Sequence, residues 1–272
     1  MAPYLLLFGK PISTYSLCIL LGGVLAWLWF HRSLRTRPEN PGTVEQAFFW
    51  GILGAFLGSK LLFLLTCLPQ LIRDLPLLQS DPAIFAARYL YGGFVFYGGL
   101  LGALGVVWLF CRHRRLSFSG LCAVLVPAVP LLHACGRVGC FFAGCCYGIP
   151  APEGWPGITF HRSFLAPNQV PLVPVQLMEA AGVFLLFLLL ACLARKGWQG
   201  SALLLLYLTA YAPLRFALEF LRGDAYRGHW GILSTSQLIA LGTLAVSLPL
   251  LVRAVRRQTK PTPTPSQNTT PN

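Results

Sequence analysis

Charged side chains are scarce in this chain of 272 residues. Only 11% of its residues are charged and just eight are Asp or Glu, whereas 56% are hydrophobic. The mean hydropathy is accordingly high, at +0.65. A soluble domain usually carries about 25% charged residues. The shortage of charge excludes a pair of soluble domains and predicts one helical membrane domain.

The chain also lacks the features of several other classes of protein. Its formal net charge of +13 does not indicate a nucleic-acid partner, because the basic residues fall in short clusters between apolar runs. The first residues include neither a basic n-region nor a small-residue cleavage site, so we expect the first apolar run to be a retained span. No internal repeat relates the two halves, which disfavours an inverted-repeat transporter. We expect membrane lipids around the chain and no nucleic acid.

Apolar runs of about 20 residues, the length needed to cross a bilayer, predict an all-α, polytopic membrane protein with seven transmembrane helices. The predicted spans are 13–31, 44–68, 92–111, 118–135, 175–194, 200–221 and 233–252. Pro127 and Pro130 interrupt the fourth span, which requires protein or water to satisfy the freed backbone groups. Residues 1–257 then form one membrane domain, and the Pro/Thr-rich residues 258–272 are expected to be a disordered cytoplasmic tail.

Clusters of basic residues follow spans one, three, five and seven and hold twelve of the 21 Lys and Arg residues. All four clusters lie on one side if the N-terminus is outside and the C-terminus is cytoplasmic, as the positive-inside rule requires. The clusters are Arg32, Arg35 and Arg37; Arg112, Arg114 and Arg115; Arg195 and Lys196; and Arg253, Arg256, Arg257 and Lys260. The longer loops 69–91 and 136–174 are then expected on the outer side.

The segment GRVGCFFAGCCYG, from Gly136 to Gly148, combines four glycines with three cysteines. Glycine permits close backbone approach and positive φ, so we expect an irregular segment that lines a cavity on the outer side. Cys140, Cys145 and Cys146 have three possible roles: zinc binding, a disulfide or small apolar packing. Because neither a Cys-x-x-Cys pair nor a nearby His-x₃-His pair is present, packing is favoured and no metal or other cofactor is expected.

The predicted span 200–221 carries Arg215, Glu219 and Arg222 at positions i, i+4 and i+7. This spacing predicts that the three side chains share one helical face. They form either a structural ion pair near the outer interface or a basic pocket for an anionic head group, in which Glu219 orients an arginine. Arg137 is expected at a similar depth on the same side. Ionisable groups within spans usually mark function, which favours the pocket.

Three further ionisable residues have mainly structural interpretations. Lys60, in the middle of a span, is expected to snorkel to an interface or to pair with an acid. Glu179 is expected to cap a helix or to pair with an arginine. His133, near the end of the fourth span, is expected to be a hydrogen-bonded core residue.

Two tyrosines and a group of glycines indicate interfacial or packing roles. Tyr15 and Tyr97 are typical of interfacial anchors. Glycines surround Tyr97 and indicate either close helix packing or a ligand that approaches the backbone. They are Gly92, Gly93, Gly98, Gly99 and Gly102.

Six motifs, taken in order, resemble the prolipoprotein diacylglyceryl transferase family, a family of bacterial inner-membrane enzymes with seven spans. The resemblance covers nearly all of the chain up to the tail. The motifs are ISTYSLCILLGG, GGFVFYGGLLG, GRVGCFFAGCCYG, VPVQLMEA, LRFALEFLRGD and ILSTSQL. No single motif decides the matter, but their order and topology together are specific.

The resemblance implies an activity, its partners and a location. The family takes the diacylglyceryl group from phosphatidylglycerol and places it on the thiol of the lipobox cysteine in a preprolipoprotein signal peptide. Glycerol phosphate leaves and a thioether forms, which is the first step of lipoprotein maturation. The chain is then expected to be a multi-pass transferase of the bacterial inner (plasma) membrane.

The resemblance also assigns roles to residues of this chain. Arg137 and Arg215 would hold the lipid phosphate as charge develops on it, Glu219 would orient Arg215, and Tyr97 would complete the catalytic set. Tyr15 would line the pocket. The other residues expected to bind substrate are Gly98, Gly99, Gly136, Gly139, Cys140, Gly144, Gly148 and Arg222.

Three positions depart from the family pattern. Tyr97 replaces the histidine of a His-Gly-Gly motif, Cys140 replaces the usual Asn, and Lys60 stands for a typical arginine. Tyrosine is a poor base near neutral pH, because its reference pKa is about 10. Tyr97 is then activated by a neighbouring arginine, or the base role is spread over other groups. The alternative is a diverged paralogue that acts on another lipid or acceptor, or that is inactive.

Overall fold

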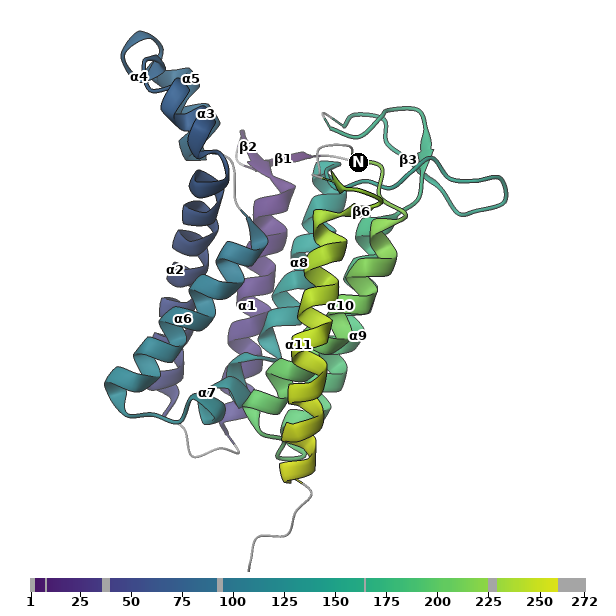
Figure 1. The fold of residues 1–272 in the computed structure, drawn as a ribbon. Coiled ribbons are helices and arrows are strands. Elements are labelled where there is room, and N and C mark those ends of the chain that lie inside the picture. Colours follow the sequence, from purple (N-terminus) through teal and green to yellow (C-terminus); the bar gives the residue numbers. More distant parts are fainter. Residues whose placement is uncertain are drawn as a thin grey trace, which may run out of the picture. The chain divides into compact units, whose positions relative to one another are not determined.

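The computed structural model describes residues 3–7, 9–35, 40–91, 95–163, 165–224 and 229–258, and these are mostly helical (Figure 1). Within these ranges, six helical segments are long and apolar enough to cross a membrane. They are α1 (Thr14–Leu34), α2 (Pro41–Thr66), α7 with α8 (Phe118–Ala143), α9 (Val175–Arg195), α10 (Gly200–Glu219) and α11 (Thr235–Gln258). A helical protein with several candidate spans is therefore confirmed.

The remaining elements are shorter or connect these helices. α6 (Phe96–Arg114) has 19 residues, and the chain between α2 and α6 contains α3 (Leu68–Arg73), α4 (Leu77–Ser80), α5 (Pro82–Ala86) and the π-helix η1 (Ala87–Tyr91). Pro127 stands at the N-cap of α8 (Ala128–Ala143), which follows α7 (Phe118–Leu125). Three antiparallel two-stranded ribbons complete the fold: β1 (Tyr4–Leu7) with β2 (Lys10–Ser13), β3 (Ile158–Thr159) with β4 (Pro171–Leu172), and β5 (His229–Trp230) with β6 (Leu233–Ser234).

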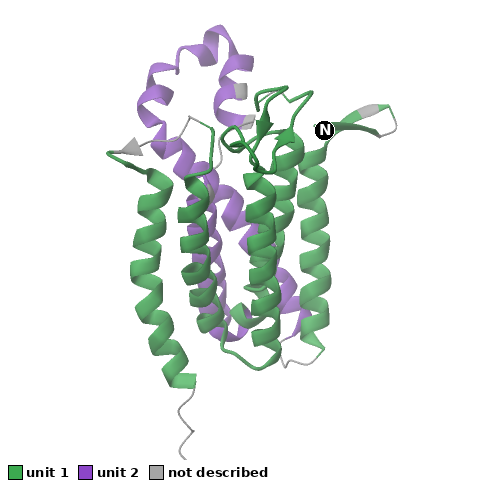
Figure 2. Ribbon diagram, turned by 90° about the vertical axis from the view of Figure 1, so that its right-hand side faces the viewer, with its two compact units in different colours: residues 1–35, 122–272 green, residues 36–121 purple. Residues whose placement is uncertain are grey.

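The chain divides into two compact units (Figure 2). Unit 1 comprises residues 1–35 and 122–272, and unit 2 comprises residues 36–121, with the boundary inside α7. In unit 1, α1 packs on α8, α8 on α9, α9 on α10, and α10 on α11. The indole of Trp29 ties α1 to the end of α7 by donating to the Val124 carbonyl oxygen at 3.1 Å. Unit 1 is thus a bundle in which α8, α9 and α10 occupy the middle.

Unit 2 is built on glycine contacts between α2 and α6. A Cβ added to Gly98 would lie 2.3 Å from the Gly58 carbonyl oxygen, and one added to Gly102 would lie 2.2 Å from that of Gly54. The two helices are therefore antiparallel and in direct backbone contact, as small residues permit in membrane helices. Lys60, on α2, donates to the Leu90 carbonyl oxygen at 3.1 Å.

The connection between α2 and α6 is stabilised by one carboxylate. The hydroxyl of Tyr89 donates to Asp74 Oδ2 at 2.7 Å, and Arg88 forms an ion pair with the same oxygen. These hydrogen bonds from Tyr89 and Arg88 hold the pKa of the Asp74 carboxyl below its usual value. Polar contacts thus order a segment that the sequence analysis treated as an outer loop.

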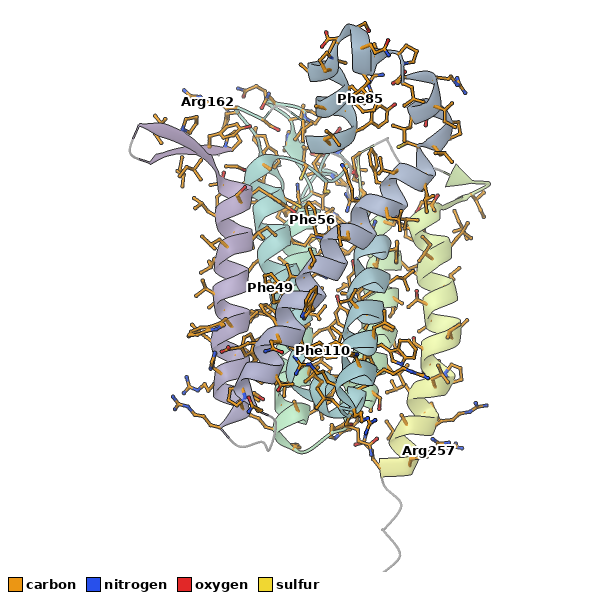
Figure 3. All side chains as sticks on the ribbon, turned by 90° about the vertical axis from the view of Figure 1, so that its left-hand side faces the viewer. Phe49, Phe56, Phe85, Phe110, Arg162 and Arg257 are labelled. Carbon is orange, nitrogen blue, oxygen red and sulfur yellow. The ribbon has the colours of Figure 1, made fainter. Side chains whose placement is uncertain are left out.

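Large apolar side chains cover the outside of the long helices. Phe49 and Phe56 on α2 are 64% and 57% exposed, a pattern that suits contact with lipid chains (Figure 3). Arg162 and Arg257 lie at opposite ends of unit 1 (Figure 3).

Two expectations from the sequence need correction or fall outside the described residues. The prediction of an irregular segment from Gly136 is wrong for its first eight residues, because α8 continues to Ala143 and ends at Gly144 with φ +72°. Contacts with α1 shield the glycine-rich turn, so it stays helical. Residues 92–94, which include Gly92 and Gly93, and residues 259–272 of the predicted tail lie outside the described ranges.

We predict that Gly98→Ala destabilises the protein and that Gly105→Ala does not. The added methyl group at Gly98 overlaps the backbone of α2, whereas a Cβ at Gly105 on the same helix has nothing within 4 Å. Overpacking typically costs about 1–3 kcal/mol. Thermal unfolding in detergent measures the difference. Equal unfolding temperatures for the two variants would contradict the close contact between α2 and α6.

Candidate active site

Glu179, on α9, is the centre of a network of polar side chains inside unit 1. Its side chain is 0% exposed. Its Oε1 accepts a hydrogen bond from Tyr211 Oη at 2.7 Å and pairs with Arg137 Nη2 at 3.0 Å. His133 Nε2 lies 3.5 Å from the same oxygen. One carboxylate oxygen therefore joins α8, α9 and α10.

His133 and Arg137 lie one turn apart on α8 and contact each other. Arg137 Nε donates to His133 Nε2 at 3.3 Å, and His133 Nδ1 lies 3.2 Å from Tyr207 Oη. Because Nε2 accepts a hydrogen bond, a neutral imidazole carries its proton on Nδ1. His133 and Glu179 thus fix two nitrogens of the Arg137 guanidinium, while 17% of that side chain stays exposed. Arg137 is both oriented and accessible.

Arg215, on α10, is a second fixed cation. It forms an ion pair with Glu219 one turn further along the helix, and Nη2 donates to Ser236 Oγ on α11 at 3.1 Å. Its Nη1 is buried and has no hydrogen-bond partner among the described residues. Leaving a buried donor unsatisfied is costly, more so when it is charged. An anionic oxygen at this nitrogen would remove that cost.

Arg222 does not share the helical face of Arg215 and Glu219, so the last member of the predicted stripe is wrong. α10 ends at Glu219, and Arg222 pairs through its backbone with Gly148 instead of continuing the helix. The Arg222 side chain makes two 2.9 Å hydrogen bonds to the carboxylate of Asp224. The backbone pairing of Arg222 with Gly148 holds the segment after α10 against the segment after α8.

The three cysteines of the glycine-rich segment come together. The sulfur atoms of Cys140, Cys145 and Cys146 all lie within 4.8 Å of one another. Hydrogen bonds with the other two thiols, and the nearby cations of Arg222 and Arg137, hold the pKa of the Cys146 thiol below its usual value. The cysteines therefore lie beside two of the arginines described above.

Gly136 and Gly139 face α1. A Cβ at Gly139 would lie 3.0 Å from Cδ2 of Tyr15, which is tighter than most contacts, whereas one at Gly136 would lie 3.4 Å from Ile19. Gly139 thus allows Tyr15 to approach α8. Tyr15 is itself near Cys140 and Arg137, so this predicted residue belongs to the same cluster.

Gly144 and Gly148 shape the chain after α8. A Cβ at Gly144 would lie 2.1 Å from Ser163 Oγ, and one at Gly148 would lie 2.3 Å from the Val173 carbonyl oxygen. Gly144 also has a φ of +72°, which glycine adopts without strain. Both glycines are therefore required by the local backbone.

Tyr97, Gly98 and Gly99 belong to unit 2 and are grouped there with α2. Gly98 and Gly99 are buried, and a Cβ at Gly99 would lie 2.6 Å from Ser59 Oγ. Tyr97 is half-buried in the first turn of α6. The sequence indicated either close helix packing or a ligand that approaches the backbone at these glycines. The contacts in the structure are those of helix packing.

The sequence analysis did not include Tyr207 and Tyr211, two tyrosines of the Glu179 network, in the predicted site. It did name His133 and Glu179, but it gave them structural roles. The sequence contains a signal for the tyrosines. Tyr207, Tyr211, Arg215 and Glu219 recur every four residues, which places them along one side of α10. A row of four polar side chains in an apolar helix indicates a shared polar environment.

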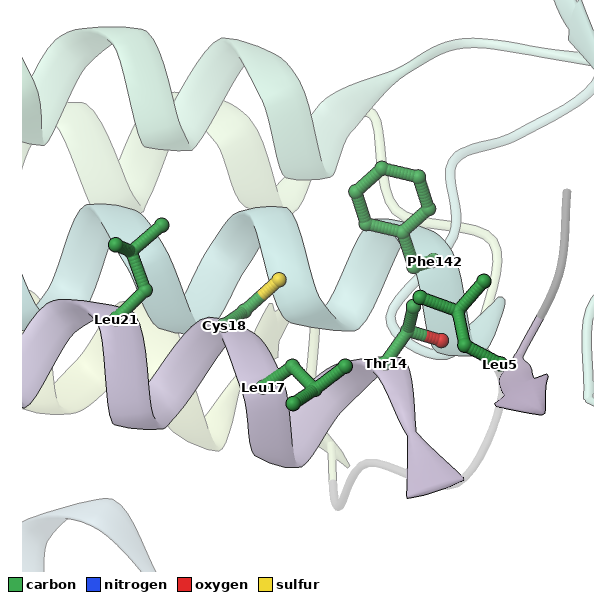
Figure 4. A pocket seen from close by; sticks show the side chains of 6 residues that line it. All are labelled: Leu5, Thr14, Leu17, Cys18, Leu21 and Phe142. Atoms are coloured by element: carbon green, nitrogen blue, oxygen red, sulfur yellow. The ribbon is translucent and has the colours of Figure 1, made fainter. Parts of the chain in front are cut away.

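An apolar recess lies in unit 1, mainly along α1 (Figure 4). Its volume is about 320 Å³. α1 contributes most of its lining, and β1 and α8 contribute one residue each. The lining residues are Leu5, Thr14, Leu17, Cys18, Leu21 and Phe142. Cys18 also contacts the position of Gly139, so the recess adjoins the cysteine-containing turn.

Comparison with known proteins identifies the family. The family model described as prolipoprotein diacylglyceryl transferase matches residues 3–253. The chain belongs to this family. A Clostridium tetani protein named phosphatidylglycerol–prolipoprotein diacylglyceryl transferase is 34% identical over 242 residues, which cover 89% of this chain and 93% of that protein. A similarly named Clostridium perfringens protein is 34% identical over 236 residues (86% and 88%), and one from Cupriavidus pinatubonensis is 32% identical over 250 (88% and 86%).

The match to the prolipoprotein diacylglyceryl transferase family includes every site residue described above. It extends from before β1 into α11 and so spans both compact units. The resemblance inferred from six short motifs is therefore confirmed at the level of the family. The roles of individual residues remain predictions.

We predict that Glu179→Gln lowers stability while Glu153→Gln leaves it nearly unchanged. The amide keeps the shape of Glu179 but leaves the Arg137 cation without its ionic partner. Breaking one half of a buried ion pair costs about 3–5 kcal/mol. Glu153 is exposed in the loop after α8, so its loss should cost less than about 0.5 kcal/mol. Unfolding followed by circular dichroism in detergent compares them, and equal unfolding temperatures would rule out the proposed compensation.

Proposed function

We infer that this protein transfers the diacylglyceryl group of phosphatidylglycerol to the cysteine thiol of a prolipoprotein. The family match over residues 3–253 carries this conclusion, and the names of the relatives specify donor and acceptor. In the reaction, the thiol sulfur bonds to the glycerol carbon that bears the phosphate ester. The carbon–oxygen bond breaks, and glycerol phosphate leaves. The relatives are named for this same reaction, so no observation favours a different lipid or acceptor.

We propose that the enzyme lies in the bacterial inner membrane with its N-terminus outside and its C-terminus in the cytoplasm. α6 serves as a seventh span in addition to the six candidates. Residues 258–272 form a cytoplasmic tail after the membrane domain of residues 1–257. The basic clusters support this orientation through the positive-inside rule. Reporter fusions to the C-terminus would measure it. The acceptor cysteine then arrives from the outer side, within the lipobox of a signal peptide.

Arg137 is proposed as one ligand of the donor phosphate. His133 and Glu179 hold its Nε and Nη2, which reduces the freedom lost when a ligand binds. The exposed part of the guanidinium remains available for phosphate oxygens, to which arginine binds through two parallel hydrogen bonds. Negative charge grows on the phosphate as the carbon–oxygen bond breaks, so a fixed cation stabilises the transition state more than the ground state.

Arg215 is proposed as the second phosphate ligand. Its unsatisfied Nη1 supplies the donor, and Glu219 and Ser236 fix the orientation of the side chain. Glu219 is thus a positioning residue for Arg215. A lipid phosphate oxygen at Nη1 would complete the hydrogen bonding of a buried guanidinium.

The other predicted residues are proposed to shape the site or to contact the substrates. Tyr15, Gly136, Gly139 and Cys140 lie where α1 meets the end of α8, beside the apolar recess that suits an acyl chain of the donor. Three more residues shape or line the adjoining segment. They are Gly144, Gly148 and Arg222.

Tyr97, with Gly98 and Gly99, is proposed to contribute from α6. This assignment rests on the family resemblance alone. A phenol, with a reference pKa of about 10, suits the role of a hydrogen-bond donor better than that of a base. Gly98 and Gly99 hold the first turn of α6 against α2 and thereby fix the position of Tyr97 within unit 2.

We predict that Arg137→Ala and Arg215→Ala each lower thioether formation by about 10²–10³-fold, the usual cost of removing one fixed transition-state donor. Arg162→Ala, in an exposed loop, serves as the control and should retain activity. The assay measures transfer from phosphatidylglycerol micelles to a lipobox peptide. Normal lipidation by both site variants would refute the phosphate assignment.

We predict that Tyr97→Phe lowers the transfer rate by about 10²-fold or more, the typical contribution of a positioned proton donor. Tyr97→His should retain most of the rate, because imidazole also donates. Tyr4→Phe, at an exposed position in β1, provides a matched loss of one phenol hydroxyl. Full activity of Tyr97→Phe would show that this hydroxyl takes no part in the reaction.

A further inference from the structure

The proposed reaction leaves one chemical requirement unmet. The thiolate, not the thiol, is the nucleophile, and an ordinary cysteine with a pKa of about 8.5 is mostly protonated at neutral pH. A phenol, with a reference pKa of about 10, is a poor acceptor for that proton near neutral pH. Another means of generating the acceptor thiolate would meet this requirement. The cluster of Cys140, Cys145 and Cys146 is well placed to provide one.

The three thiols are arranged as a set of ligands. Their sulfur atoms lie within 4.8 Å of one another. Zn–S bonds of about 2.3 Å place the sulfurs of a tetrahedral zinc site about 3.8 Å apart, so a shift of about 1 Å completes the geometry. Among the described residues, no His, Asp or Glu joins this group. Three protein ligands with an open fourth position are typical of catalytic zinc sites, whereas structural sites have four.

The backbone that carries the thiols is bent to bring them together. Gly144 has φ +72°, and Cys146 has φ +59°, a left-handed conformation that a residue with a side chain rarely adopts. The Cys145 amide donates to the Cys140 carbonyl oxygen at 3.1 Å, and the buried Gln176 amide donates to the Cys145 carbonyl oxygen at 2.9 Å. Backbone strain of this kind is retained mainly at functional sites. Simple packing of small residues does not require it.

A buried cation points to negative charge at the thiols. The Arg222 side chain is 2% exposed, and its Nη1 has no hydrogen-bond partner among the described residues. Arg222 faces the Cys146 thiol, and Arg137 also lies close to Cys140 and Cys146. Three thiolates exceed the charge of Zn²⁺ by one negative charge. Arg137 and Arg222 lie beside that negative charge, and each also pairs with an acid, Glu179 and Asp224 respectively.

We propose that Cys140, Cys145 and Cys146 bind a zinc ion as thiolates, and that the open fourth position binds the acceptor cysteine of the prolipoprotein as its thiolate. This inference rests on the proposed transferase function and revises the expectation from the sequence that no metal is bound. A disulfide is the competing use of these thiols. It would join two of them and would give no role to the third sulfur.

Coordination supplies the missing deprotonation. A thiol that binds a metal ion loses its proton, which passes to solvent. The zinc-bound sulfur then uses one electron pair to bond to the glycerol carbon, and the carbon–oxygen bond to phosphate breaks. That bonding pair leaves on the oxygen of glycerol phosphate, close to Arg137. The product thioether carries no negative charge on sulfur and is a weak ligand, so it dissociates and the ion is unchanged.

The first test measures metal content. Full-length protein is purified in detergent with its thiols reduced, supplied with zinc, desalted and analysed by elemental mass spectrometry. We expect about one zinc per chain in the wild type and a large loss in C140S, C145S and C146S. C192S, which removes an exposed thiol on α9 outside the cluster, is the control and should keep its zinc. Zinc-free wild type, or equal zinc in all variants, overturns the proposal.

The second test detects the open coordination position without relying on variants that fold. Cobalt(II) replaces zinc in the wild type, and thiolate-to-cobalt absorption reports the ligands. A lipobox peptide with its cysteine should change this spectrum, and the same peptide with serine should not. An identical response to both peptides refutes acceptor coordination. A disulfide between any two of Cys140, Cys145 and Cys146 in freshly isolated membranes, found by non-reducing peptide mapping, also overturns the proposal.

Activity measurements separate this inference from the function on which it rests. We expect chelation to lower thioether formation by at least tenfold and added zinc to restore it. Full transfer by verified zinc-free protein refutes the zinc inference and leaves the transferase function standing. Binding of zinc and of the cysteine peptide with no thioether under any condition refutes the transferase function and leaves the metal site standing.

Discussion

The site depends on a negative charge buried in the middle of a helical bundle. An unpaired carboxylate in such surroundings would be very costly. Glu179 is compensated because Arg137 and Tyr211 bind one of its oxygens from α8 and α10. The contacts that satisfy the charge also fix these helices against α9. Packing of unit 1 and orientation of Arg137 are thus two effects of the same interaction.

A pairing of an arginine with an acid occurs three times among the described residues of unit 1. Arg137 is paired with Glu179, Arg215 with Glu219, and Arg222 with Asp224. Each acid fixes part of a guanidinium, and Arg215 and Arg222 each retain one buried nitrogen without a hydrogen-bond partner among the described residues. An acid that occupied the whole guanidinium would leave nothing for a ligand. Partial pairing therefore gives cations that are already oriented and still able to bind an anion.

Local patterns in the sequence predicted the local features of this structure. Hydropathy located the six long helices, and the i, i+4 spacing predicted the pair of Arg215 and Glu219. The same spacing rule failed for Arg222, because a helix end is set by the backbone pairing with Gly148, which no spacing reveals. Contacts between helices likewise could not be predicted from the sequence. Nothing near Glu179 in sequence identifies Arg137 as its partner, and the turn that gathers three cysteines depends on Gln176 from another helix.

Two of the three departures from the family pattern, Tyr97 and Cys140, affect the same requirement. A histidine would take the proton of the acceptor thiol, whereas a phenol at neutral pH donates one. A site that lacks a base can still form a thiolate if it stabilises negative charge on sulfur strongly enough. Arg137 and Arg222 lie near the Cys146 thiol and favour its thiolate. Arg137 is also the proposed phosphate ligand. Its guanidinium would therefore stabilise negative charge on the sulfur before the reaction and on the phosphate after it. Under this proposal, bond formation and bond breaking would occur within a single electrostatic environment.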